Sequence, residues 1–111
     1  MTDKIVVLNT CEKEAEAESL ARLLIDRQLA ACVNIVPQVR SFYRWKGSVE
    51  SSEEFLLMVK TSRALFDEVK TAIEQAHSYE IPEIVALPVV DGAADYLGWL
   101  ESNLKKAPEP E

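Results

Sequence analysis

The longest extended pattern in this chain runs from Ala31 to Lys46. Side chains alternate with a period of two over Ala31–Val36 and, after Pro37, again over Val39–Trp45. At about 3.3 Å per residue, these 16 residues would reach roughly 50 Å. A domain of this size has a radius of gyration of about 13 Å, which makes its body about 35 Å across. The predicted strand is therefore longer than the domain that carries it.

A second extended segment follows a turn at residues 46–48 and runs from Glu53 to Lys60, with apolar residues on both faces as in a central strand. The two segments predict a long hairpin whose far end carries Phe42, Tyr43 and Trp45. Exposed aromatic area of this extent marks interaction surfaces. We therefore expect these three residues to lie in an interface between copies of the chain.

In an alternative prediction, the aromatic residues are covered by their own chain and not by a second copy. Pro37 removes one ladder donor and could bend the strand, so that the aromatic residues fold back on their own sheet. Each piece would then have the usual strand length of about five or six residues.

The other segments predict elements on either side of this hairpin. The β-branched run Ile5–Leu8 predicts a first strand, and the polar residues 9–10 predict a turn after it. Apolar residues at spacings of three and four predict amphipathic helices over residues 12–28 and 65–76. These helices flank the hairpin in the sequence.

The second helix is expected to be capped by Thr61 or Ser62. Residues 83–90 predict an edge strand, because Pro88 interrupts them, and a last helix carries Tyr96–Leu104. The order of elements predicts an α+β, ferredoxin-like βαββαβ fold, in which both helices cover one face of an antiparallel sheet and an additional helix follows.

Composition limits the class of protein. With 111 residues, 48% of them hydrophobic and 28% charged, the chain predicts one water-soluble domain over residues 1–106 and a disordered tail over 107–111. The apolar run near the first residue is too short for a signal peptide or a membrane span, so we expect a cytoplasmic protein with no membrane partner. The net charge of −7 argues against nucleic acid as a partner.

Catalytic machinery is not visible in the sequence. The chain has 3 glycines and no glycine-rich phosphate loop, and no serine or cysteine has an evident histidine partner. We therefore expect no catalytic residues and no enzyme activity.

Five motifs make the chain similar to a known family. They are ACVNI at 31–35, SFYRWKG at 41–47, EEFLLMVKT at 53–61, HSYEIPE at 77–83 and YLGW at 96–99. Together they resemble the CutA family, which is named for divalent-cation tolerance. The resemblance extends from Ile5 to Leu104 and implies a homotrimer, organised like the PII signalling proteins, in which long hairpins join neighbouring subunits. It also implies an association with copper and other divalent cations and a part in the response to metal ions.

The chain departs from the family pattern at three positions. Family members credited with copper binding have a thiol at the end of the first strand and a doubled histidine, whereas this chain has Asn9 and the pair Ala76 and His77. Cys11, two residues after Asn9, is a possible substitute for that thiol. Ser78 stands where the family usually has proline, which relaxes the loop backbone without removing a ligand.

The metal candidates are His77 and Cys11. Imidazole is the commonest ligand for borderline metals, but a site with one histidine also needs Cys11, a carboxylate such as Glu80 or Glu83, or a residue of another copy. Cys11 lies near a predicted helix start, where the amide dipole lowers the pKa of a thiol. The alternative is that His77 neutralises the carbonyl dipole at a helix end. Cys32 is expected to be a small core side chain.

The candidate ligand-binding residues are Lys60, Tyr79, Glu80 and Glu53, which fall within the matched motifs. In a trimer the hairpin ends and the loop after the second helix would line a cleft between subunits, and such clefts commonly bind ligands. This suggests a second function, a regulatory or scaffold trimer that binds a small molecule. The alternative is that Lys60 and the glutamates pair with one another across the interface between subunits.

Overall fold

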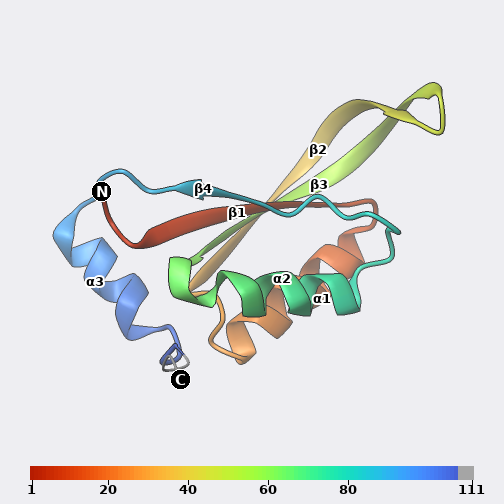
Figure 1. The fold of residues 1–111 in the computed structure, drawn as a ribbon. Coiled ribbons are helices and arrows are strands. Elements are labelled where there is room, and N and C mark those ends of the chain that lie inside the picture. The colour runs from red at the N-terminus through yellow and green to blue at the C-terminus, as the bar shows by residue number, and fades with distance from the viewer. Residues whose placement is uncertain (108–111) are drawn as a thin grey trace.

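A four-stranded antiparallel sheet in the order β2-β3-β1-β4 forms the centre of the computed structural model, which describes residues 1–107. The elements in chain order are β1 (Lys4–Cys11), α1 (Glu14–Asp26), β2 (Cys32–Trp45), β3 (Ser48–Ser62), the short 3-10 helix η1 (Arg63–Leu65), α2 (Phe66–Ala76), β4 (Val85–Pro88) and α3 (Ala94–Ser102). Helices α1 and α2 lie on the same side of the sheet, and α3 stands at one end of it (Figure 1). The predicted α+β, ferredoxin-like arrangement with an additional helix is confirmed. Apart from Ala107, the predicted disordered tail lies outside the described residues.

The core lies between the sheet and the two helices. Alternate residues of β1 and β3 point toward the helices, and they meet the apolar stripes of α1 and α2, whose three- and four-residue spacing puts them on one helix face. The side chains at the centre of this layer are at most 5% exposed: Ile5, Val7, Leu20, Leu24, Leu57, Val59, Val69 and Ile73. Each large apolar side chain buried in this way contributes about 1.5–3 kcal/mol to folding.

The β2–β3 hairpin extends well beyond the layer of helices (Figure 1). Its turn has positive φ at both central residues, Lys46 (50°) and Gly47 (84°), which gives the turn a twist that matches that of the strands. At its end Phe42 is 69% exposed, and Tyr43 and Trp45 are exposed as well. The predicted overshoot is confirmed, and the alternative in which the aromatic residues fold back on their own sheet is wrong.

A register shift between Val36 and Val39 interrupts the β2–β3 ladder. Pro37 lies in it, and Gln38 adopts a φ of 60°. Pro37 therefore lies outside the paired positions of an edge strand, which is where a sheet tolerates a proline. The bulge also changes the parity of the strand, so that Tyr43 and Trp45 lie on the same face of the ribbon as the even-numbered residues of β3.

Three local predictions are wrong. Residues 9–10 are not a turn, because the ladder with β3 continues through Thr10 to Cys11. Neither Thr61 nor Ser62 caps a helix with its side chain. The hydroxyl of Thr61 instead donates to the carbonyl oxygen of Leu29 at 2.6 Å. Cys32 is half-buried on the face of β2 that points away from the helices and is not a core side chain.

Buried Lys4 connects α3 to the sheet, because its ammonium group pairs with Glu101 and, at 2.8 Å, with Asp3. The backbone N–H of Lys105 donates to the carbonyl oxygen of Gln28 at 2.9 Å, which joins the segment after α3 to the end of α1. Among residues 1–107, no helix combines the length and the apolar character that crossing a membrane requires.

Two glycine substitutions test the geometry of the hairpin turn. Gly47→Ala should lower the free energy of unfolding by about 1 kcal/mol, because φ at Gly47 is 84° and an alanine there is strained. Gly98→Ala makes the same chemical change inside α3, where a Cβ meets no atom within 4 Å, and should raise it by about 0.5–1 kcal/mol. Urea unfolding at one fixed protein concentration measures both values. Equal effects of the two substitutions would contradict the turn.

Candidate functional site

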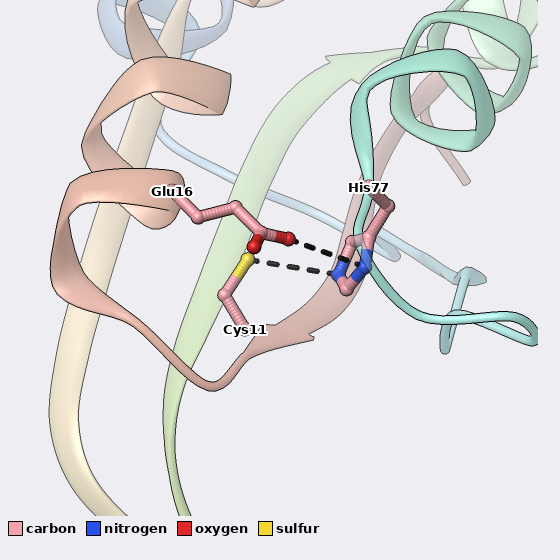
Figure 2. A group of neighbouring side chains, drawn as sticks. All are labelled: Cys11, Glu16 and His77. Carbon is pink, nitrogen blue, oxygen red and sulfur yellow. Dashed lines mark hydrogen bonds and ion pairs between the residues drawn. The ribbon is translucent and has the colours of Figure 1, made fainter.

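Three side chains from three elements meet at the end of β1 (Figure 2). Cys11 is the last residue of β1, Glu16 stands in the first turn of α1, and His77 directly follows α2. Their sulfur, oxygen and nitrogen atoms lie within 4.8 Å of one another. We call these three residues the Cys–Glu–His cluster.

The imidazole of His77 is buried and has a hydrogen-bond partner on each nitrogen. Nδ1 accepts a hydrogen bond from the backbone N–H of Tyr79 at 3.0 Å. A nitrogen that accepts carries no proton, so Nε2 carries it and donates to the carbonyl oxygen of Thr10 at 2.7 Å. The ring thus ties the segment after α2 to β1, and its partners are Thr10 and Tyr79 rather than the last carbonyl groups of α2.

The carboxylate of Glu16 is held by the loop that follows His77. The backbone N–H of Ser78 donates to Oε1 at 3.1 Å, and the Ser78 hydroxyl donates to Oε2 at 2.8 Å. Oε1 also lies 3.3 Å from Nδ1 of His77. A proline at position 78 would make neither bond to Glu16, because it has no N–H and no hydroxyl. Ser78 therefore attaches the loop to α1.

The thiol of Cys11 is buried and lies 3.7 Å from Nε2 of His77. Burial, together with the nearby carboxylates of Glu16 and Glu54, raises its pKa from an ordinary value of 9.0 to about 12. The expected lowering of this pKa by a helix start is wrong, because Cys11 is the end of a buried strand and α1 begins only at Glu14. The thiol is protonated at neutral pH.

Asn9, which replaces the thiol expected from the family pattern, lies on the same face of β1 as Cys11 and is also fully buried. Its Nδ2 donates to the carbonyl oxygen of Glu83 at 2.9 Å, and its Oδ1 accepts from the thiol of Cys11 at 3.5 Å. Asn9 therefore connects the Cys–Glu–His cluster to the loop that leads into β4.

A cleft of about 830 Å³ opens between the β2–β3 hairpin and the loop over residues 78–83. The hairpin contributes aromatic side chains, among them Tyr43 and Trp45, and the loop contributes Tyr79. Four glutamates also line the cleft, and no lysine, arginine or histidine is among its lining residues: Glu50, Glu54, Glu80 and Glu83. The cleft is therefore aromatic and strongly acidic.

Tyr79 and Glu54 fix the two sides of this cleft to each other. The hydroxyl of Tyr79 donates to Oε2 of Glu54 at 2.7 Å, and Glu54 is only 5% exposed. Burial and the neighbouring Glu54 carboxylate raise the pKa of Tyr79 above its usual range. The phenol therefore keeps its proton and serves as a donor to the carboxylate.

The structure brings together only some of the candidate residues. Tyr79 and Glu80 line the cleft, while Glu53 is exposed outside the lining. Lys60 lies opposite Val6, toward the other end of β1, and its ammonium group contacts the hydroxyl of Tyr96 at 3.3 Å. The cleft therefore does not contain the predicted lysine.

Sequence reasoning missed two carboxylates. Glu16 rather than Glu80 or Glu83 completes the cluster with Cys11 and His77. Glu54 rather than Glu53 faces the cleft. The alternation of β3 could have indicated Glu54, because Phe55 and Leu57 point toward the core, which puts Glu54 and Leu56 on the other face of the strand. No spacing rule indicates Glu16, which meets its partners only through the packing of α1 on the sheet.

Comparison with known proteins gives consistent matches over most of the chain. The family model described as "CutA1 divalent ion tolerance protein" matches residues 5–103. "Divalent-cation tolerance protein CutA" of Thermus thermophilus is 47% identical over 98 residues, which cover 88% of this chain and 95% of that protein. "Protein CutA" of Mus musculus is 42% identical over 82% of this chain, and the match spans only 51% of the mouse protein.

Solved structures match to the same extent. The structure of the divalent cation tolerance protein (Cut A1) from Thermus thermophilus superposes with a TM-score of 0.89 and 45% sequence identity. The superposition covers 92% of this chain and 99% of that one. The fold therefore agrees with that solved structure across nearly its whole length.

The raised pKa of Cys11 predicts a loss of stability in alkaline solution. The thiol ionises near pH 9.0 in the unfolded chain and near pH 12 in the folded one. Its contribution to the free energy of unfolding is therefore complete below pH 9 and declines as the pH rises toward 12. Between about pH 8 and about pH 10 the wild type should lose about 1.4 kcal/mol more than Cys11→Ala. Urea unfolding across this range measures the difference.

Cys32→Ala is the matched control, because it removes the other thiol and leaves Cys11 in place. It should follow the pH dependence of the wild type. If the free energy of unfolding changed equally with pH in the wild type and in Cys11→Ala, burial of Cys11 would not favour its protonated form.

Proposed function

The chain belongs to the CutA1 divalent ion tolerance family, and from this premise we propose that it is a homotrimer that binds copper or a similar divalent ion in the cellular response to metal ions. The observation that carries the metal-binding part is the Cys–Glu–His cluster, in which a thiol, a carboxylate and an imidazole lie within 4.8 Å of one another. No catalytic activity is proposed. A cytoplasmic location is part of the proposal and rests on the sequence alone.

The donor set of the cluster favours borderline and soft ions. Sulfur and imidazole ligands suit copper and zinc, whereas magnesium and calcium prefer oxygen ligands alone. The ligand atoms come from Cys11, Glu16 and His77. Backbone N–H groups of the loop after α2 donate hydrogen bonds to Glu16 and to His77 and so fix both side chains. A copper or zinc ion is therefore the cation that these three residues fit best.

Binding would replace interactions that the folded chain already makes. The thiol of Cys11, whose pKa is about 12, must lose its proton, and His77 must release either the N–H of Tyr79 or the carbonyl oxygen of Thr10. Glu16 can keep its two hydrogen bonds from Ser78, because each of its oxygens has a second lone pair for an ion. Each of these costs lowers the affinity, so this cluster suits reversible binding better than permanent retention of an ion.

Copper titration of the purified chain, followed calorimetrically, tests this site. The wild type should show saturable binding, and His77→Ala should abolish it because the cluster loses its one nitrogen ligand. Glu80→Gln, which changes a carboxylate outside the cluster, should bind as the wild type does. Unchanged binding by His77→Ala would refute the proposed site.

The uncovered face of the sheet supports self-association. Helices α1 and α2 cover one face, and the apolar residues on the other face are Val6, Leu8, Val36, Leu56, Met58, Val85 and Leu87. Val36, Val85 and Leu87 are 39–49% exposed in the single chain. An apolar face of this size, together with an unpaired long edge strand in β2, is typical of a surface that a partner covers.

Sedimentation at micromolar concentration tests the assembly. The expected mass is three times the 12.5 kDa of one chain. The mass of a single chain would remove the trimer from the proposal and leave the Cys–Glu–His cluster to be judged by the titration alone.

A second function, a regulatory or scaffold trimer that binds a small molecule, is favoured by the cleft of about 830 Å³ with Tyr79 and Glu80 in its lining. Thermal shifts with divalent ions and with metabolites, measured side by side, distinguish the two. Stabilisation by ions and not by metabolites supports the metal-binding function. Stabilisation by metabolites alone supports the second function.

A further inference from the structure

Ser78 directs both of its hydrogen-bond donors to one carboxylate. Its backbone N–H donates to Oε1 of Glu16 at 3.1 Å, and its hydroxyl donates to Oε2 of the same side chain at 2.8 Å. The two donors belong to one residue, and each binds a different oxygen. A carboxylate held through both oxygens cannot rotate freely about its last C–C bond. Ser78 therefore fixes the orientation of the Glu16 carboxylate.

The carboxylate is held where the other members of the Cys–Glu–His cluster can share a ligand with it (Figure 2). Its Oε1 lies 3.3 Å from Nδ1 of His77, and the Glu16 side chain is only 17% exposed. Each oxygen uses one lone pair for Ser78 and keeps a second one. The two hydrogen bonds thus hold Glu16 in place and leave it able to bind a cation.

A third ligand matters in this chain because the sequence departs from the family pattern. Asn9 and Ala76 stand where family members credited with copper binding have a thiol and a second histidine. Cys11 and His77 alone supply two ligands, and Glu16 supplies the third. Three protein ligands are the number that zinc sites with an open position commonly use. The orientation of Glu16 therefore bears directly on whether the cluster can hold an ion.

We propose that Ser78 is a positioning residue of the metal site, which holds the Glu16 carboxylate ready to bind the ion. The inference rests on the proposed metal-binding function and adds a residue that sets the affinity of that site. A glutamate side chain loses rotational freedom when it binds an ion, and one that hydrogen bonds already hold has less freedom to lose. Replacing a residue that hydrogen-bonds to a metal ligand typically lowers metal affinity about 10- to 100-fold.

A purely structural role is the alternative, in which the two bonds only fasten the loop to α1. The same loop offers a comparison, because Tyr79 fastens it to β3 through a hydroxyl group that donates to Glu54 at 2.7 Å. Glu54 is not a member of the Cys–Glu–His cluster. If fastening alone mattered, loss of either attachment would weaken ion binding. If Ser78 positions Glu16, only loss of the bonds from Ser78 should do so.

The backbone at this point is compatible with a proline, which removes both donors at once. His77 has a φ of −84° and a ψ of 142°, the extended conformation that a residue before a proline adopts. Ser78 does not have a positive φ, which a proline could not adopt. Ser78→Pro therefore tests the two donors rather than the course of the loop.

Calorimetric titration with Zn²⁺ tests the positioning role, because zinc has no redox chemistry and leaves the thiol of Cys11 intact. Ser78→Pro should weaken binding at least about tenfold, and Ser78→Ala, which keeps the N–H, should weaken it less. Ser78→Thr keeps both donors and should bind within about twofold of the wild type.

Tyr79→Phe is the matched control, because it removes the other attachment of the loop and keeps the backbone N–H that bonds to His77. It should lower the free energy of unfolding, measured in urea without metal, and leave the Zn²⁺ affinity within about twofold of the wild type. The same unfolding curves show that each variant is folded. If Ser78→Pro does not fold, the comparison of Ser78→Ala with Ser78→Thr decides the result.

The outcomes separate this inference from the proposed function. If the wild type binds neither Zn²⁺ nor copper, the metal site fails and the inference with it. If the wild type binds and the folded Ser78→Pro and Ser78→Ala variants bind equally tightly, only the inference fails. Weakening of Tyr79→Phe to the same extent as Ser78→Pro, or no recovery of affinity in Ser78→Thr, would also overturn it, because the bonds would then act only through the attachment of the loop.

Discussion

The ladder between β1 and β3 is the interaction on which the rest of this structure depends. It pairs residues from Lys4↔Ser62 to Cys11↔Phe55 without a register shift, so the two strands share their inward and outward faces along the whole length of β1. The inward face supplies the sheet side of the core. The end of the same ladder carries Thr10 and Cys11 to the place where they meet the segment after α2.

At this end of β1, the hydrogen bonds to the segment after α2 involve backbone groups as well as side chains. His77 bonds to the carbonyl oxygen of Thr10 and to the N–H of Tyr79, and Glu16 bonds to both donors of Ser78. These bonds satisfy polar groups that would otherwise be buried without partners. The Cys–Glu–His cluster therefore holds β1, α1 and the segment after α2 together, and in the proposed metal site an ion would have to replace one of the two hydrogen bonds of the His77 ring.

The two faces of the sheet have different roles. The face toward α1 and α2 is covered within the chain, while the other face leaves apolar side chains and a long hairpin without cover. Among residues 1–107 of a single copy, the apolar side chains of this second face have no helix over them, and this is the observation on which the proposed self-association rests.

Local patterns in the sequence determined the elements of this protein and their order, because periods of two and of about 3.6 residues arise from the backbone geometry of each segment alone. The length of the hairpin and the exposure of its aromatic end follow from the same pattern. Only the tertiary structure decided that residues 9–10 continue β1, that Glu16 and Glu54 are the relevant carboxylates, and that burial raises the pKa of Cys11. The reason is physical: hydrogen bonds such as His77 to Thr10 join residues 67 positions apart, and desolvation depends on what packs around a group rather than on its neighbours in the chain.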